Sequence, residues 1–150
     1  MAIREIVKSD LKQWSKMRTS LWPNTQDNHL SEINEFFSGE SIDIDQVYVA
    51  VFDEQPVGFI ELNMRNFAEG SRHPLVPYVE AWYVEPEHRG MGYGKALMRQ
   101  AEEWALAQGC TELASDTEIT NHQSIAMHRH LGFEETERIV CFLKKLNTID

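Results

Sequence analysis

Long apolar runs, cysteine and positive charge are all scarce in this chain of 150 residues. Its longest apolar runs fall far short of the roughly 20 residues that a membrane-spanning helix needs, so we expect no segment to cross a membrane. The two cysteines, Cys110 and Cys141, are too few for a disulfide framework. Their scarcity predicts free thiols and a cytoplasmic protein. No repeat, linker or low-complexity tract divides the chain, which predicts a single domain over residues 1–150.

Acidic residues outnumber basic ones, with 24 Asp and Glu against 14 Lys and Arg, for a formal net charge of -10. Nucleic-acid binders are usually basic, so this balance speaks against a nucleic-acid partner. It favours a cationic small molecule or a basic peptide as the partner. The alternative is an acidic surface that serves solubility alone.

Hydrophobic periodicity predicts strands and helices in alternation, in a mixed α/β sheet with at least one parallel crossover. We expect six to seven strands flanked by about four helices. The predicted strands cover residues 2–7, 47–52, 57–64, 79–84 and 112–115, with residues 133–146 as one or two more. The predicted helices cover residues 10–21, a segment from Ser31, the segment up to about Gln108, and a segment from Asn121 or Ser124 to Gly132.

Three glycines crowd the turn between the strand over residues 79–84 and the long helix, in the run RGMGYG over residues 89–94. Glycine weakens a helix, so another requirement should explain them. Unpaired N–H groups at a helix start attract an anion, and glycine lets a diphosphate approach closely. The run is not a GxGxxG motif. A tight turn without a ligand therefore remains the alternative.

The run Arg89-x-x-Gly92-x-Gly94, directly after a buried strand, resembles the first signature of the GCN5-related N-acetyltransferase superfamily. The run NHQSIAMHRHLGF, from Asn121 to Phe133, resembles the second, an Asn followed by a short helix that ends in Gly-Phe. The order of elements is similar as well, over essentially the whole chain. The resemblance implies the fold of that superfamily, acetyl-CoA as co-substrate, and no metal.

The same resemblance implies where acetyl-CoA binds. Backbone amides from Gly90 to Lys95 would hold its pyrophosphate, and the end of the central strand would pair with its pantetheine arm as an added strand does. An N–H of that strand could also stabilise the oxyanion at the thioester carbonyl. The implied cofactor-binding residues are Trp82, Tyr83, Val84, Arg89, Gly90, Met91, Gly92, Tyr93, Gly94, Lys95 and Asn121.

Four further segments resemble one branch of the superfamily, the aminoglycoside 6'-N-acetyltransferases. They are LWP (residues 21–23), YVEAWYV (78–84), LASDT (113–117) and GFEETERIV (132–140). The resemblance implies acetyl transfer to the 6'-amine of aminoglycosides, antibiotic resistance, and a homodimer built through C-terminal strands. It implies a drug site formed by Trp22, Glu80, Asp116, Glu137 and, where the branch often has a Tyr, Phe67.

Residue chemistry points to the same carboxylates, because each ammonium of a polycation needs an anionic or carbonyl partner. Strand alternation predicts that Glu80 shares a face with Tyr78 and Trp82, where a carboxylate is costly to desolvate unless it is paired. We expect Glu80 to act as the base, directly or through water, and Asp116 to place the ammonium, or the two roles to be exchanged. The structural alternatives are a buried hydrogen bond for Glu80, a turn cap for Asp116, core packing for Trp22 and a solvated charge cluster for Glu137.

His128 stands where the superfamily often has a Tyr that protonates the departing thiolate, and it either donates a proton or only packs on its helix. Neither cysteine lies in a setting typical of an acetyl-enzyme, so we expect direct transfer in a ternary complex. Two other functions remain open. One is a polyamine or protein N-terminal acetyltransferase, and the other is a non-catalytic acyl-CoA-binding domain.

Overall fold

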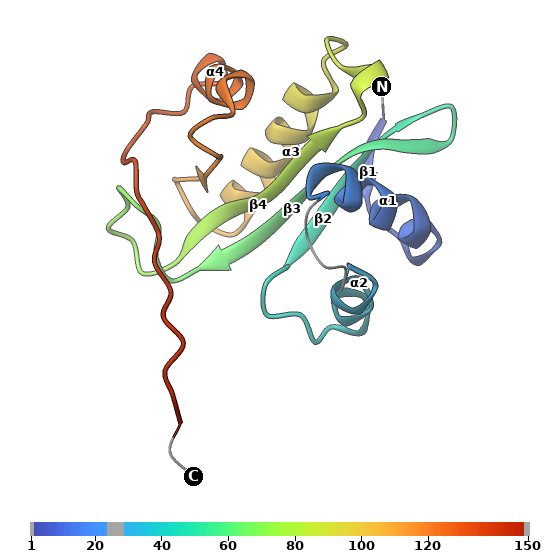
Figure 1. The fold of residues 1–150 in the computed structure, drawn as a ribbon. Coiled ribbons are helices and arrows are strands. Elements are labelled where there is room, and N and C mark those ends of the chain that lie inside the picture. The colour runs from blue at the N-terminus through green and yellow to red at the C-terminus, as the bar shows by residue number, and fades with distance from the viewer. Residues whose placement is uncertain (1, 24–28, 149–150) are drawn as a thin grey trace. The chain divides into compact units, whose positions relative to one another are not determined.

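A computed structural model describes residues 2–23 and 29–148 (Figure 1). The chain forms two compact units, the first ending at Asp116 and the second beginning at Thr117. None of the described helices has the length and hydropathy needed to span a membrane.

The first unit is built on a sheet of five strands in the order β1-β2-β3-β4-β5. Neighbouring strands from β1 to β4 run antiparallel, and β5 runs parallel to β4, which confirms the predicted mixed sheet. The strands are β1 (Ala2–Glu5), β2 (Gln46–Phe52), β3 (Gln55–Arg65), β4 (Val76–Val84) and β5 (Ala114–Ser115).

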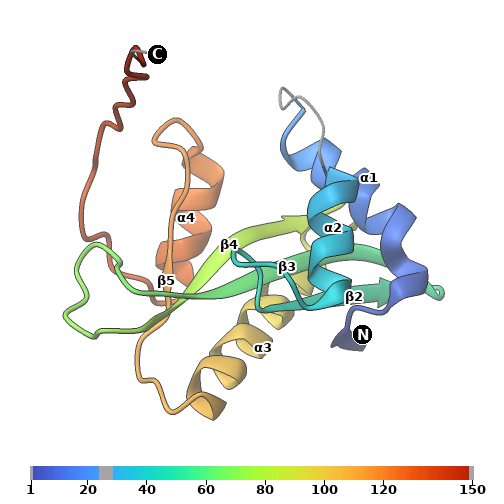
Figure 2. The same cartoon turned by 90° about the horizontal axis from the view of Figure 1, so that it is seen from below.

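The described residues form four α-helices, as predicted: α1 (Leu11–Leu21), α2 (His29–Ser38), α3 (Tyr93–Ala107) and α4 (His122–His130). Short 3-10 turns precede α1 (Lys8–Asp10) and α3 (Pro86–His88). In the first unit, α1 and α2 cover one face of the sheet and α3 covers the other (Figure 2).

The core beneath α1 and α2 is aromatic. Trp14 is fully buried, and the rings of Phe36 and Phe37 in α2 meet it edge-on at 5.6 and 5.9 Å. Trp14 and Met17 lie three residues apart on α1, so the helical repeat turns both toward the sheet. This packing fixes the face of the sheet on which the site is built.

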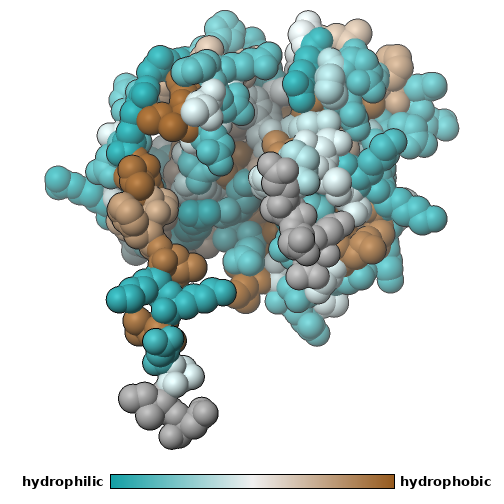
Figure 3. All heavy atoms as spheres, in the orientation of Figure 1, coloured by the Kyte–Doolittle hydropathy of each residue, from teal (hydrophilic) through white to brown (hydrophobic). Residues whose placement is uncertain are grey.

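The second unit contains α4 and the segment that follows it. The side chain of Asn121 caps α4 by accepting a hydrogen bond from the Ser124 N–H at 3.0 Å. The expected strands over residues 133–146 are not found, so the predicted strand count is one or two too high. A strand needs a hydrogen-bonded neighbour, and no described strand pairs with this segment. Its apolar side chains appear as brown spheres on the way to the C-terminus in Figure 3.

Candidate active site

β4 contains one residue more than β3 at the point where Glu80 lies. Val79 pairs with Leu62, whereas Ala81 pairs with Glu61, so Glu80 is the extra residue of a β-bulge. A bulge bends its strand and re-aims nearby side chains, which is why bulges recur beside active sites. The bulge therefore decides which side chains share a face with Glu80.

Tyr78 and Glu80 both face the α1–α2 side of the sheet, where they contact the same arginine, Arg65. Trp82 faces the opposite side, where its indole Nε1 donates to the carbonyl of Gly94 in α3 at 3.0 Å. The expectation that Trp82 shares a face with Glu80 is therefore wrong. The extra residue reverses the alternation of side chains between Tyr78 and Trp82.

Two side chains, Arg65 and Tyr78, join the predicted catalytic carboxylates Glu80 and Asp116. The guanidinium of Arg65 donates to Glu80 twice, from Nε to Oε2 and from Nη2 to Oε1, both at 2.6 Å. The same guanidinium carbon lies 3.7 Å from the centroid of the Tyr78 ring. The Tyr78 hydroxyl donates to Asp116 Oδ2 at 2.6 Å. The structure thus brings Glu80 and Asp116 into one network at the end of β5.

Burial and the neighbouring Asp116 carboxylate raise the pKa of Tyr78 well above its ordinary value. The hydroxyl therefore remains a donor to Asp116 throughout the neutral and mildly alkaline range. The pKa of Arg65 is raised as well, chiefly by its hydrogen bonds to Glu80. Both shifts follow from the same geometry, in which donors and carboxylates alternate.

A cavity of about 250 Å³ opens on the α1–α2 side of the sheet, next to Glu80. Five of the side chains that line it are acidic and one, Arg18, is basic, so its wall favours a cationic ligand. The lining residues are Arg18, Trp22, Glu32, Glu35, Ser41, Asp43, Ile44, Glu61 and Glu80.

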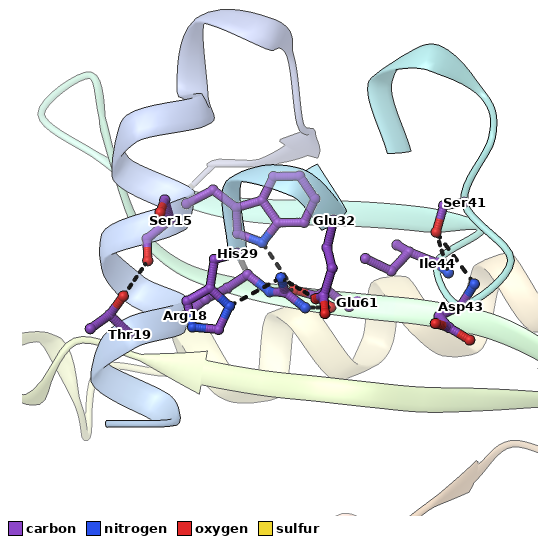
Figure 4. A network of polar contacts seen from close by, with 10 residues as sticks. Ser15, Arg18, Thr19, His29, Glu32, Ser41, Asp43, Ile44 and Glu61 are labelled. Carbon is purple, nitrogen blue, oxygen red and sulfur yellow. Dashed lines mark hydrogen bonds and ion pairs between the residues drawn. The ribbon is translucent and has the colours of Figure 1, made fainter. Parts of the chain in front are cut away.

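Arg18 holds two of these carboxylates (Figure 4). Its Nε lies 2.9 Å from Glu61 Oε2, and its Nη1 lies 2.6 Å from Glu32 Oε2. Glu61 is only 1% exposed and also accepts a hydrogen bond from Trp14 Nε1 at 3.0 Å. Complete burial raises the pKa of Glu61, although Arg18 and Trp14 act in the opposite direction. The two ion pairs tie α1 to α2 and to β3 at the wall of the cavity.

Two carboxylates of the cavity, Glu35 and Asp43, pair with no cation among the described residues. They remain available to the ammonium groups of a ligand. Trp22 lines the same cavity, and its ring lies 5.1 Å from the Arg18 guanidinium carbon while it also packs against the core. Trp22 therefore fits both the predicted site role and its structural alternative.

The glycine-rich turn forms an open cradle at the start of α3. Gly90 and Gly92 have φ angles of +78° and +88°, in the left-handed region that favours glycine. Gly92 is the N-cap of α3, and its carbonyl accepts from the Ala96 N–H at 3.0 Å. The preceding N–H groups, from Tyr93 to Lys95, have no acceptor within the helix and point out of its start. Such a start fits the pyrophosphate of coenzyme A.

Gly94 differs from the other two glycines, because it lies inside the first turn of α3. A Cβ at this position would lie 3.5 Å from the Trp82 ring, which is ordinary van der Waals contact within the protein. The missing side chain of Gly94 therefore lies on the side of α3 that faces Trp82. Arg89 donates from Nε to the Val84 carbonyl at 2.8 Å and so holds the turn against the end of β4.

Strand β5 ends alongside Val79, so β4 has no β5 neighbour from Glu80 onward. β5 pairs with it only at Tyr78 and Val79, while β3 continues along it as far as Val84. The edge of β4 from Glu80 to Val84 thus has no β5 partner among the described residues. A strand edge that extends beyond the end of its neighbour accepts an added strand, so this stretch of β4 fits the amide-bearing pantetheine arm.

The other predicted site residues lie as follows. Phe67 is 65% exposed on the loop after β3, and Met91 is exposed in the glycine-rich turn. In the second unit, Glu137 is exposed, and the Ser124 carbonyl accepts a hydrogen bond from Nδ1 of His128 at 2.8 Å. The His128 ring also packs edge-on against the Phe133 ring, as the helix-packing alternative predicts.

The sequence analysis missed the cavity carboxylates Glu32, Glu35 and Asp43, and also Arg18, Glu61 and Arg65. A usable signal was present for the last three. Glu61 interrupts an apolar strand, and Arg18 lies on the buried stripe of α1, which is unusual for charged side chains unless they pair. Arg65 continues an alternating polar pattern with Glu61 and Asn63, which marks one face of β3 as polar.

Residues 9–133 match the acetyltransferase (GNAT) family. The chain is 42% identical over 146 residues to the aminoglycoside N(6')-acetyltransferase type 1 of Klebsiella aerogenes, covering 96% of both proteins. It is 37% identical to the protein of the same name from Acinetobacter haemolyticus, covering 98% of this chain and all of that one.

Solved structures show the same similarity. The apo structure of the aminoglycoside 6'-N-acetyltransferase AAC(6')-IG from Acinetobacter haemolyticus has a TM-score of 0.83 at 35% identity, covering 98% of this chain and 100% of that one. AAC(6')-Iy in complex with the bisubstrate analogue CoA-S-monomethyl-acetylneamine has a TM-score of 0.87 at 33% identity. The match covers 97% of this chain and 98% of that one. This chain belongs to the acetyltransferase (GNAT) family.

Proposed function

We propose that this protein is an aminoglycoside 6'-N-acetyltransferase. It transfers the acetyl group of acetyl-CoA to the 6'-amine of aminoglycoside antibiotics and thereby confers resistance. One observation carries the proposal: Glu80 both borders the acidic cavity and marks the residue at which β4 becomes free of β5. An amine held at Glu80 therefore lies beside an acyl group bound along the free edge of β4.

The acidic wall supplies the recognition that a polycation needs. Glu35, Asp43 and Glu80 offer carboxylates to ammonium groups, and Trp22 offers a ring face for stacking. We assign Phe67, Asp116 and Glu137 to the same substrate site. The relatives named above act on aminoglycosides, which supports this choice of substrate.

The coenzyme would be held by backbone rather than by charged side chains. The amides of residues 90–95 face its pyrophosphate, Trp82 to Val84 pair with its pantetheine arm, and Arg89 fixes the turn. We also assign Asn121 to this site, although its side chain is engaged in capping α4. The described residues contain no group of three or more His, Cys, Asp or Glu side chains that could hold a metal ion.

The chemistry requires removal of a proton, because a free alkyl ammonium has a pKa of about 10. Glu80 or Asp116 accepts that proton, directly or through water, and the amine lone pair then attacks the thioester carbonyl carbon. Bound acetyl-CoA supplies the acetyl group, and its C–S bond breaks with the electron pair leaving on sulfur. The new amide nitrogen loses its second proton and the thiolate gains one. His128 is the candidate donor.

We propose that a main-chain N–H of β4, between Trp82 and Val84, donates to the carbonyl oxygen as negative charge develops there. We propose that the enzyme acts in the cytoplasm, as one acetyltransferase domain over residues 1–150. We further propose a homodimer, because the segment after α4 exposes Val140, Phe142 and Leu143 to solvent.

A polyamine acetyltransferase is the second candidate, since the same carboxylates suit a linear polycation. An assay of CoA release with kanamycin, spermidine and a basic peptide as acceptors separates the functions. We expect turnover with kanamycin. Turnover with spermidine or the peptide alone would replace the proposed substrate, and tight CoA binding without any turnover would indicate a non-catalytic domain.

A further inference from the structure

The carboxylate of Glu80 is already occupied in the folded protein. Arg65 donates to both of its oxygens at 2.6 Å, and Asn63 Nδ2 lies 3.5 Å from Oε2. A carboxylate offers about four acceptor positions, so these three donors leave room for one more. Glu80 can therefore accept a single N–H from a bound ammonium while Arg65 stays in place.

Arg65 is itself held in place from a second side. Its guanidinium lies over the Tyr78 ring at 3.7 Å, and Tyr78 is anchored through its hydroxyl to Asp116. Moving the guanidinium away from Glu80 would break two short hydrogen bonds and the ring contact together. Arg65 is thus part of the architecture of the site, although its side chain is 39% exposed.

We propose that Arg65 is a positioning residue of the acceptor site, which holds the Glu80 carboxylate in place as the anchor for the substrate ammonium. This inference rests on the proposed function and adds a division of labour to it. The Glu80 oxygens already accept two hydrogen bonds from Arg65 and one from Asn63, and the position that is left suits the N–H of an ammonium. Glu80 therefore binds and orients the amine and is not the base that deprotonates it.

Asp116 is then the carboxylate of the pair that accepts the proton, directly or through water. It receives the Tyr78 hydroxyl on Oδ2 alone, and no described residue donates to its Oδ1. One oxygen thus remains open for a proton. The neutral phenol orients Asp116 without adding charge, whereas Arg65 adds a full positive charge beside Glu80.

The test is a double-mutant cycle on acetylation of kanamycin, with Arg65→Met, Glu80→Gln and the double variant. Glu80→Gln should raise KM for kanamycin about tenfold or more and change kcat less than about threefold. Arg65→Met should lower kcat/KM for kanamycin by about tenfold, chiefly through KM, because Glu80 is no longer held in place to bind the ammonium. In the Glu80→Gln background the same change should cost nothing further, because Arg65 acts through Glu80.

Arg65→Lys keeps the charge but cannot donate two parallel hydrogen bonds to Glu80. Its loss of kcat/KM for kanamycin should therefore lie between those of the wild type and Arg65→Met. Arg72→Met is the matched control, since Arg72 is exposed and makes no ion pair among the described residues. The KM for acetyl-CoA should stay unchanged in all these variants. A structural role for Arg65 would instead lower activity equally in both backgrounds and raise the KM for acetyl-CoA.

Equal losses of kcat/KM from Arg65→Met in the wild-type and Glu80→Gln backgrounds would overturn the inference. A fall of 100-fold in kcat for Glu80→Gln at unchanged KM would also overturn it. Turnover of spermidine but not kanamycin would refute the proposed substrate alone, and the same cycle would then test Arg65 with spermidine. An inactive wild-type protein would refute the proposed function and the inference together.

Discussion

Tyr78 connects the two halves of the site at the scale of single residues. Its ring packs against the Arg65 guanidinium, and its hydroxyl donates a hydrogen bond to Asp116. Neither contact requires the phenol to ionise, and its raised pKa keeps the proton on the hydroxyl well past neutral pH. The residue therefore acts as a fixed donor rather than as an acid or a base.

Replacing Tyr78 with Phe tests that role. The ring contact with Arg65 survives, but Asp116 loses its orienting donor, so kcat/KM for the aminoglycoside should fall by about tenfold with little change in melting temperature. Tyr48→Phe is the control, because Tyr48 is a buried tyrosine of β2 outside the network. Equal rates for the two variants would show that the Tyr78 hydroxyl contributes nothing.

At the scale of elements, the extra residue in β4 and the start of α3 build the site. The bulge at Glu80 was beyond sequence reasoning, because the run YVEAWYV looks the same with or without an extra residue in the pairing. Only the register with β3 decides it. The glycine-rich turn was predictable, since left-handed backbone at a helix start is a local demand for glycine.

Two glycines offer a matched test of the cradle. Gly90 and Gly109 have φ angles of +78° and +79°, and a Cβ at either position would meet no other atom within 4 Å. Each change to Ala should destabilise the fold by a similar amount, about 1 kcal/mol, measured by thermal unfolding. Only Gly90→Ala should weaken coenzyme A binding in calorimetry. Equal CoA affinities for the two variants would rule out the cradle at residues 90–95.

At the scale of the whole molecule, the sequence predicted the order of strands and helices correctly, but it did not predict the conformation of the segment after α4. Residues 133–146 contain the apolar run IVCFL (139–143), yet no described strand pairs with them. Local pattern indicates that a segment is able to form a strand, whereas the partner decides whether it does. A second copy of the chain would supply such a partner, as the proposed homodimer requires.

Changing Phe142 and Leu143 to Ser tests the dimer. These side chains are 92% and 90% exposed, so the change should leave the fold intact while removing apolar surface from the interface. Light scattering on the eluting protein should show a dimer for the wild type and a monomer for the double variant. Leu106→Ser, on the exposed side of α3, should remain dimeric. A monomeric wild-type protein would contradict the proposal.

The central claim is that the protein acetylates the 6'-amine of an aminoglycoside bound in the acidic cavity, beside the part of β4 that extends beyond β5. Neomycin B and paromomycin I test it most directly, because they differ only in carrying an amine or a hydroxyl at the 6' position. With purified protein and acetyl-CoA, we predict CoA release with neomycin and none above background with paromomycin. Equal release with both compounds, or none with neomycin, would contradict the account.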